Sequence, residues 1–292
     1  MAVTWAPAIY TDIGWRNYQA FLQSGFANIL GHANGALHRK LARIGFEAVG
    51  DIFLPFCYGQ MTFAFHVALE KDIPLVFFGE NGEAEYGGNT AHNELPGRPI
   101  EEFGGVYFKG TTVDDAVQWG IDHGILTRKE VDPADLVYYR PPDVAKLKEK
   151  NISMHWLSYY EKWVPQENYY LATEQTGFKA NPDGRSEGTY SKYASLDDKL
   201  DGLHYYLGFI KFGLGRATSD AAHEIRDGHL TREEGVRLVR RFDGELPTKH
   251  LKEVLEYIEM TEEEMHRVID SYRTPHLWEK SGSEWKLKVQ VS

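Results

Sequence analysis

The sequence has very little cysteine and no long hydrophobic run. Its single cysteine among 292 residues, Cys57, excludes an intramolecular disulfide and a zinc site built from several cysteines. No apolar run approaches the roughly 18 to 20 residues that a membrane-spanning helix needs. The N-terminus has neither the charged nor the long apolar segment of a signal peptide. These absences predict a soluble protein of the cytoplasm that does not associate with membranes.

Basic residues are also in deficit. The chain has 32 Lys and Arg against 43 Asp and Glu, a formal net charge of -11. A general nucleic-acid-binding surface is not expected, because neutralising phosphates requires clustered Lys and Arg. A local basic pocket is still compatible with this balance. Aromatic residues make up 13% of the chain, which suits either a core with amphipathic residues at its rim or a site that stacks on sugars.

Several familiar catalytic motifs are missing. Neither G-x-S-x-G nor a Walker-A pattern occurs, so the sequence does not support a serine hydrolase or a P-loop kinase. The histidines are scattered, with no compact metal-ligand spacing. Cys57 lies among apolar and aromatic residues, which favours a structural role.

The first half of the chain alternates short apolar runs with helical patterns, which predicts an α/β fold. We expect strands at 2–6, 73–78 and 152–159, and helices at 34–49, 60–71, 112–123 and 143–150. The run at 73–78 is continuously apolar, as in a strand buried on both faces of a parallel sheet. The stretch that follows, to about residue 105, is rich in Gly, Pro and Asn and is expected to be a long loop.

The second half is predicted to be mostly helical. Residues 163–201 are polar, aromatic and turn-rich, and we expect helices at 203–212, 219–227, 231–241, 248–259 and 261–273. Thr231 with Glu234, and Thr261 with Glu264, have the spacing of capping boxes. Residues 279–292 are expected to form an irregular tail or an edge strand. The predicted division is an α/β domain at 1–160 and a substrate-binding, helical region at 161–292.

An acidic loop follows the apolar strand. Glu80, Glu83 and Glu85 lie among glycines at the expected carboxyl end of a parallel strand, where open α/β sheets bind ligands. Carboxylates there are suited to holding Mg²⁺ beside substrate phosphates. The alternative is a solvated acidic turn.

A glycine-rich segment at 208–220 has cations beside it. Lys211 and Arg216 flank two glycines, and Thr218 and Ser219 follow at the expected entry to a helix, whose first amides favour an anion. The pattern predicts a phosphate clamp. The alternative is a helix that ends at Gly213, followed by one with Ser219 as its N-cap.

A third polar segment spans 185–193. Arg185, Glu187, Tyr190 and Lys192 crowd a turn rich in hydrogen-bonding groups. Arg185 offers a bidentate fork and Lys192 a point charge, which suits an anionic substrate.

Four long blocks of sequence resemble a known family. They are TWAPAIYTDIGWRNYQ, NGALHRKLARIGFE, PFCYGQMTFAFHVALEKDIPLVFFGENGEAEYGG and EGTYSKYASLDDKLDGLHYYLGFIKFGLGRATSDAAHEIRDGHLTREE. From about residue 3 to 272 the chain resembles the N-acetyl sugar amidotransferases, bacterial enzymes of lipopolysaccharide and flagellin-sugar biosynthesis of the pseudaminic acid type. The resemblance implies the PP-loop ATP pyrophosphatase superfamily, with a Rossmann-like, adenine nucleotide alpha-hydrolase-like parallel sheet.

The implied reaction uses ATP and Mg²⁺ to convert a sugar N-acetyl group into an acetamidino group, releasing AMP and pyrophosphate. The resemblance makes the acidic loop and Lys211 catalytic candidates, with Glu83 and Glu85 as metal ligands. It assigns nucleotide contacts to Thr4, Trp5, Gly79, Lys211, Arg216, Thr218 and Ser219, and sugar contacts to Arg185, Glu187, Tyr190 and Lys192. Cys57 is the only thiol and lies in an apolar context, so a glutaminase Cys-His pair is not expected in this chain. The resemblance implies a glutaminase subunit that supplies ammonia and works with a synthase-like partner. The C-terminal helices suit a homodimer or partner docking, or simply a solvated face.

One motif of the superfamily is absent. Its phosphate-gripping S-G-G-x-D-S turn belongs to a strand and helix that should precede VTWAP, and Met1 stands at that point. We therefore expect a sheet without its first strand-helix unit, either in a shortened gene product or with that unit supplied by another chain. The polypeptide alone is expected to bind ATP poorly. Two other functions stay open: a different AMP-forming PP-loop amidotransferase or ligase, and a non-catalytic scaffold subunit.

Overall fold

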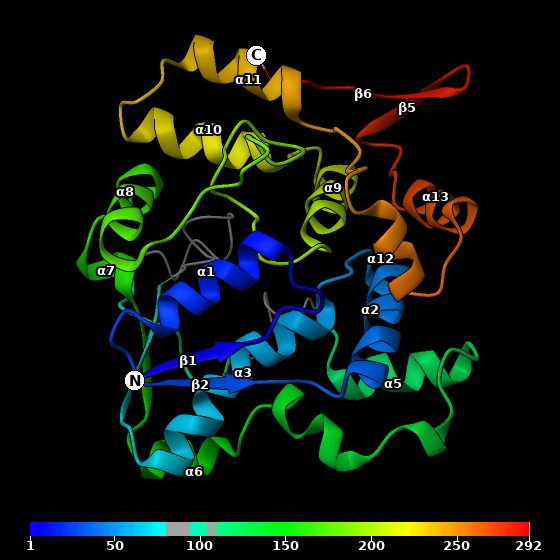
Figure 1. The fold of residues 1–292 in the computed structure, drawn as a ribbon. Helices are drawn as coiled ribbons and strands as arrows, with labels where there is room; N and C mark the ends of the chain where they lie inside the picture. Colours follow the sequence, from blue (N-terminus) through cyan, green and yellow to red (C-terminus); the bar gives the residue numbers. More distant parts are fainter. Residues whose placement is uncertain (80–93, 104–107, 109, 292) are drawn as a thin grey trace. The chain divides into compact units, whose positions relative to one another are not determined.

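The computed structural model describes residues 1–79, 94–103, 108 and 110–291, and it is a mixed α/β structure in which helices predominate (Figure 1). The chain divides into two compact units. Unit 1 comprises residues 1–7, 25–49 and 54–163, and unit 2 comprises 8–24, 50–53 and 164–292. The chain passes from unit 1 to unit 2 for the last time after residue 163, and the domain boundary predicted from the sequence is at 160. Unit 2 also takes two short segments from the N-terminal part of the chain.

Unit 1 contains two pairs of parallel strands. Strand β1 (Ala2–Trp5) pairs with β2 (Asn28–Gly31), and β3 (Leu75–Phe78) pairs with β4 (Ser153–Trp156). The predicted strands near 2–6 and 73–78 are confirmed, while β2 was not predicted. The strand predicted at 152–159 is confirmed only for Ser153–Trp156, because residues 157–160 form a helix. Within the described residues the strands form two separate pairs, not the continuous Rossmann-like sheet that the resemblance implies.

The expectation that residues 73–78 are buried on both faces is wrong. In β3 only Val76 is buried, whereas Leu75 is 39% and Phe77 is 52% exposed. Successive side chains of a strand point to opposite faces, so β3 places one face on the core and leaves the other uncovered by described residues. A continuous apolar run cannot distinguish these two situations by itself.

The helices of unit 1 build its hydrophobic core. They are α2 (Gly35–Val49), α3 (Leu54–Lys71), α5 (Val113–Asp122), α6 (Val144–Glu149) and α7 (Leu157–Tyr160), with 3-10 turns at Arg128–Glu130 and Pro133–Tyr139. Helix α3 starts earlier than predicted, because Pro55 stands in its first turn, where proline is tolerated. No single helix in the described ranges is long and apolar enough to cross a membrane. Helices α2 and α3 pass that test only as a pair bent by 115°, and many of their residues are buried within the protein.

Unit 2 is helical with a terminal hairpin. Its helices are α1 (Asp12–Leu22), α8 (Pro165–Thr176), α9 (Asp201–Phe212), α10 (Arg216–Arg226), α11 (Arg232–Phe242), α12 (Leu251–Tyr257) and α13 (Glu262–Ser271). The helices predicted between residues 203 and 273 are confirmed, as are the capping boxes at Thr231 and Thr261. The tail forms an antiparallel hairpin, β5 (Trp278–Ser281) with β6 (Glu284–Leu287).

Helices α1 and α8 were not predicted. Helix α8 buries none of its residues, so it lacks the apolar stripe by which a helix is recognised in a sequence. Helix α1 is joined to the segment before α9 by long-range bonds. The Thr11 amide donates to the Asp197 carbonyl at 3.0 Å, and the Lys199 amide donates to the Ile9 carbonyl at 2.9 Å.

Candidate functional site

Two of the segments singled out in the sequence meet in unit 2. The loop at 185–193 lies against the first turn of α10, where the Ala217 amide donates to the Gly188 carbonyl at 3.1 Å. The Thr189 hydroxyl donates to the Asp220 carboxylate from the same loop. The predicted sugar-contacting and phosphate-contacting segments are therefore neighbours, although more than twenty residues separate them in sequence.

Arg216 lies at the centre of this contact. Its Nη1 donates to the Tyr205 hydroxyl of α9 at 2.6 Å, and its guanidinium lies 4.6 Å from the centre of the Tyr205 ring. Its Nε lies 3.3 Å from Asp220 Oδ1, one helical turn along α10. The side chains of Arg216 and Asp220 are only 15% and 16% exposed. Arg216 is thus a mostly buried cation held between an aromatic hydroxyl and a carboxylate, and this low-dielectric setting strengthens its electrostatic interactions.

Tyrosines surround the same loop. Burial raises the pKa of Tyr193 to about 12 and also raises the pKa of Tyr190, with the carboxylates of Glu224 and Asp220 adding to both effects. Both hydroxyls therefore keep their protons at neutral pH and are able to donate a hydrogen bond. The Tyr190 oxygen is buried and has no hydrogen-bond partner among the residues that the structure describes.

The same loop also contains Lys192, a predicted sugar contact, and Tyr193, which was not predicted as a site residue. Tyr193 stacks on Tyr169 of α8, with ring centres 4.6 Å apart. The Lys192 ammonium lies 5.6 Å from the centre of the same Tyr169 ring, and Lys192 is exposed. Lys192 is therefore a predicted sugar contact with an exposed side chain, whereas the Tyr190 hydroxyl oxygen is buried.

The start of α10 already has an internal anion. The Asp243 carboxylate accepts hydrogen bonds from the Gly215 amide at 2.9 Å, the Thr218 amide at 3.2 Å and the Thr218 hydroxyl. Burial raises the pKa of Asp243, while these hydrogen bonds act in the opposite direction. As it stands, this helix start does not fit a phosphate, because Asp243 takes the donors that a phosphate would need.

The alternative prediction for the 208–220 segment was a helix that ends at Gly213, followed by a helix capped by Ser219. Its first part is confirmed. Gly213 is the C-cap of α9, with a φ of 71°. The N-cap of α10 is Gly215, so the expectation that Ser219 is the cap is wrong. Ser219 lies inside the helix, where its amide bonds to the Gly215 carbonyl at 3.4 Å. Nucleotide contacts by Thr218 and Ser219 stay predictions.

Arg185 and Glu187 both have partners within the protein. Arg185 donates to both oxygens of Glu245, at 2.6 and 2.7 Å, and lies over the Phe242 ring at 4.7 Å. Glu245 also accepts from the Gly188 amide at 2.9 Å, and its pKa is lowered chiefly by the bonds from Arg185. These contacts tie the loop to the turn after α11.

Glu187 caps the chain before α12. It accepts from the Thr248 amide at 2.9 Å, the Thr248 hydroxyl at 2.8 Å and the Lys249 amide at 3.1 Å. Sequence reasoning missed Asp243 and Glu245, which hold both predicted segments. The sequence signal for them was the Asp-Gly turn pair directly after a helical pattern.

Lys211 stands elsewhere on α9. Its ammonium lies 5.4 Å from the Phe212 ring centre and 5.8 Å from that of Tyr272. Burial lowers its pKa. It is therefore a partly buried cation among aromatic rings.

The other predicted site residues belong to unit 1. The Thr4 hydroxyl accepts from the Asn28 side-chain amide at 2.8 Å, and Trp5 is 8% exposed, with its ring packed near Phe63. Gly79 directly follows β3 and is exposed. Glu80, Glu83 and Glu85 lie outside the described residues. In the described part of the chain, no group of three or more His, Cys, Asp or Glu residues is arranged to hold a metal ion.

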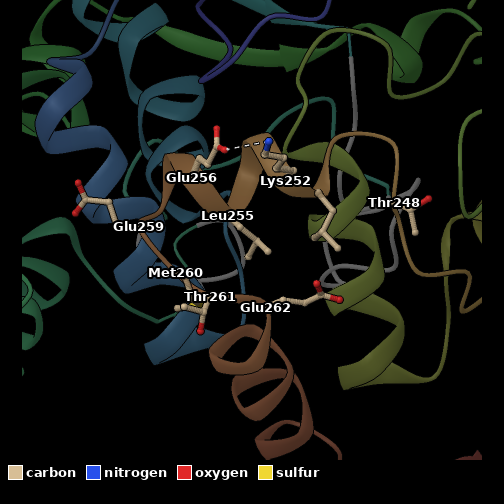
Figure 2. A pocket seen from close by; sticks show the side chains of 9 residues that line it. Thr248, Lys252, Leu255, Glu256, Glu259, Met260, Thr261 and Glu262 are labelled. Carbon is tan, nitrogen blue, oxygen red and sulfur yellow. Dashed lines mark ion pairs between the residues drawn. The ribbon is translucent and has the colours of Figure 1, made fainter.

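A separate hollow of about 580 Å³ lies beside α12 and the start of α13 (Figure 2). Its rim carries three glutamates and a lysine that pairs with one of them: Glu256, Glu259, Glu262 and Lys252. None of the site residues predicted from the sequence lines it. We assign no ligand to this hollow, because acidic residues at a rim do not by themselves indicate a binding site.

One protein family matches part of the chain. Residues 187–291 match the family model described as LPS biosynthesis protein WbpG-like, C-terminal domain. This stretch begins in the loop at 185–193 and runs through the terminal hairpin, so it contains Arg216, Asp220, Asp243 and Glu245. No curated protein matches the chain. The C-terminal part of the chain is therefore similar to a domain of LPS biosynthesis proteins.

Proposed function

We propose that the chain is an ATP-dependent, AMP-forming amidotransferase that converts the N-acetyl group of a sugar into an acetamidino group in bacterial surface-glycan or flagellin-sugar biosynthesis. The observation that carries this proposal is the match of residues 187–291 to the WbpG-like domain, which encloses the polar group around Arg216. The sequence blocks that resemble the N-acetyl sugar amidotransferases support it over a longer stretch of the chain.

The chemistry explains why a nucleotide is needed. An amide carbonyl is a poor electrophile, so its oxygen must first be turned into a leaving group. The amide oxygen bonds to the α-phosphorus of the co-substrate ATP and pyrophosphate leaves. Ammonia then bonds to the amide carbon, and AMP departs with the former amide oxygen. Positioning and electrostatic stabilisation carry most of such a reaction.

The described residues contribute to sugar binding in this proposal. Tyr190 and Lys192 donate hydrogen bonds from the loop, and the stacked Tyr169 and Tyr193 rings offer an apolar face to the sugar. Arg216, held by Tyr205 and Asp220, supplies a fixed positive charge. Arg185 and Glu187 act by holding the loop in place, since both have internal partners.

The finer fold belongs to the same proposal. We infer a PP-loop type of Rossmann-like sheet, with Glu80, Glu83 and Glu85 facing the substrate and Glu83 and Glu85 holding Mg²⁺. Its support is that both strand pairs of unit 1 are parallel and that α3 contacts both β1 and β3. Ammonia comes from a glutaminase subunit that works with a synthase-like partner, in the cytoplasm.

The test follows the amide oxygen. N-acetyl sugars, free and nucleotide-linked, carry a heavy oxygen isotope in the acetyl carbonyl and are incubated with the full chain, Mg²⁺, ammonium and saturating ATP. Ammonium replaces the glutaminase, and saturating ATP offsets the weak binding that the sequence predicts. We expect AMP that contains the label, together with an equal amount of amidine, by mass spectrometry. AMP without the label, or no AMP with any sugar, contradicts the proposal.

Arg216 offers a matched pair of variants for this assay. R216Q should lower turnover by about 100-fold, the usual scale for losing a charge-stabilising donor. R237A removes an exposed arginine of α11 and should leave turnover unchanged.

A second candidate is a non-catalytic subunit that binds the sugar or the partner proteins. It is favoured by Asp243, which occupies the predicted phosphate clamp, and by the internal partners of Arg185 and Glu187. Two measurements separate the functions: calorimetry detects binding of the sugar, and mass spectrometry detects AMP. The non-catalytic candidate requires sugar binding without any release of AMP.

A further inference from the structure

A second polar group of unit 2 contains a histidine that the sequence analysis passed over. Asp51 is 4% exposed and accepts a hydrogen bond from the Phe53 amide at 2.8 Å. The same Asp51 oxygen lies 2.8 Å from His204 Nδ1 on α9. The His204 ring stacks on Phe53 at 4.7 Å between ring centres. A buried carboxylate on Nδ1 fixes the ring and leaves Nε2 as the proton-accepting nitrogen of the neutral imidazole.

His204 shares one face of α9 with Lys211. His204, Gly208 and Lys211 follow the i, i+4, i+7 spacing that places side chains along one stripe of a helix. At Gly208, which lies between them, an added Cβ would meet no atom of the described residues within 4 Å. The stripe therefore has a histidine at one end, a residue without a side chain in its middle and a partly buried ammonium at the other end.

Other parts of unit 2 border this stripe. The Tyr272 ring lies 5.8 Å from the Lys211 ammonium. The same ring lies about 3.0 Å from the position that a Cβ would take on Gly50, the residue before Asp51. Tyr272 thus lies beside both Lys211 and the segment at 50–53.

The stripe is also connected to the group around Arg216. His204 and Tyr205 are consecutive on α9, with ring centres 4.9 Å apart, and Tyr205 bonds to Arg216. Side chains in contact therefore run from Asp51 through His204 and Tyr205 to Arg216 and Asp220. This places His204 beside the candidate site and not in an isolated part of the fold.

We propose that His204 is the proton acceptor for the attacking ammonia and that Asp51 is its positioning residue, at a site over Gly208 that also contains Lys211. This inference rests on the proposed amidotransferase function. As the new C–N bond forms, one proton passes from the ammonia nitrogen to His204 Nε2. The C–O bond to the activating group breaks and its electron pair leaves with that oxygen. Asp51 stabilises the imidazolium, which then releases the proton to water.

The test replaces His204 and supplies a base from solution. H204A should lower kcat by about 100-fold, the lower end expected for losing a general base. Its sugar KM should stay within a factor of about two of wild type, because the ring binds no sugar in this proposal. Added imidazole should restore part of kcat. D51N should lower kcat by about 10-fold, as expected for loss of an orienting carboxylate.

A matched control has the same chemistry on the surface. His266 pairs with Glu262 at 3.7 Å on α13, and His266 is 51% exposed. H266A should keep wild-type kcat. An H204A protein that melts like wild type and keeps more than half of wild-type kcat overturns the inference, and so does an H204A protein that imidazole fails to restore.

A chemical measurement covers the case in which H204A does not fold. Diethyl pyrocarbonate should modify His204 in the wild-type protein, and the N-acetyl sugar that supports turnover should protect it, as read by peptide mass mapping. A modified but unprotected His204, or one that is not modified, contradicts the inference. Wild-type protein that is inactive with every sugar instead contradicts the proposed function, so the two failures are distinguishable.

Discussion

Buried carboxylates carry much of the long-range bonding in unit 2. Asp198 is 4% exposed and accepts from the amides of Ala8 at 2.6 Å, Ile9 at 3.4 Å and Leu200 at 3.0 Å. Burial raises its pKa to about 7 in spite of these bonds, because a carboxylate loses its hydration in the interior. One side chain therefore joins the segment before α1 to the segment before α9.

The pKa of Asp198 predicts a pH dependence of stability. Because the folded-state pKa lies above the unfolded value of 3.8, the folded protein favours the protonated carboxyl. Its contribution is fully present below about pH 4 and is lost as pH rises to about 7, with a slope of about 1.4 kcal/mol per pH unit at most. D198N should flatten the pH dependence of the free energy of unfolding in this window, as measured by urea denaturation. D197N, at the exposed neighbour, should keep most of the slope, and an unchanged slope in D198N would refute the assignment.

At the scale of elements, some helices of this protein are capped by a neighbouring residue, and α10 is capped by a residue distant in sequence. Helix α11 is capped locally by Thr231 and Glu234, and α13 by Thr261 and Glu264. Helix α10 has Gly215 at its N-cap, which has no side chain, and takes its capping carboxylate from Asp243 at the end of α11. The start of α10 therefore depends on the packing of α11 beside it.

This difference predicts unequal effects of removing the caps. D243A should cost about 2 to 3 kcal/mol, because it leaves buried amides without acceptors, while T231A should cost about 1 kcal/mol. Hydrogen exchange at the Gly215 and Thr218 amides should speed up in D243A and stay unchanged in T231A. Amides that keep their protection in D243A would show that Asp243 does not cap α10.

For the whole molecule, the order of residues along the chain does not match the division into units. Unit 2 includes residues 8–24 and 50–53 as well as 164–292. Helix α1 approaches the segment before α9 so closely that a Cβ on Gly14 would lie 2.4 Å from the Asp197 Cα. Only glycine allows this backbone contact, so α1 is an integral part of unit 2.

A fragment of residues 164–292 should therefore fold poorly, because it lacks the partners of Asp198 and His204. We expect poorly dispersed amide resonances by NMR. A synthetic peptide of residues 8–24 should restore part of the dispersion, whereas the same peptide with G14V should not. A fragment that gives a well-dispersed spectrum without the peptide would show that the N-terminal segments are dispensable.

The candidate site was only partly visible in the sequence. Glycine and cation patterns singled out Arg216 and Lys211, and the polar turn singled out Arg185 and Tyr190. The residues that hold them were not found, because Asp243 and Asp51 come from distant parts of the chain and carry no local signature of their partners. Asp220 lies at the end of the segment 208–220, which the sequence analysis singled out. Its bond with Thr189 nevertheless depends on how α10 packs against the loop at 185–193.

Features that arise from neighbouring residues could be derived from the amino-acid sequence. Capping boxes at Thr231 and Thr261, the apolar periodicity of the C-terminal helices and the apolar run of β3 are local, and each produced an element near its expected place. Three features came only from the packed structure: β3 exposes one face, Asp243 accepts the donors of the predicted phosphate clamp, and His204 bonds to Asp51. The reason is physical: burial and long-range hydrogen bonds depend on which segments pack together, and local periodicity contains no information about that packing.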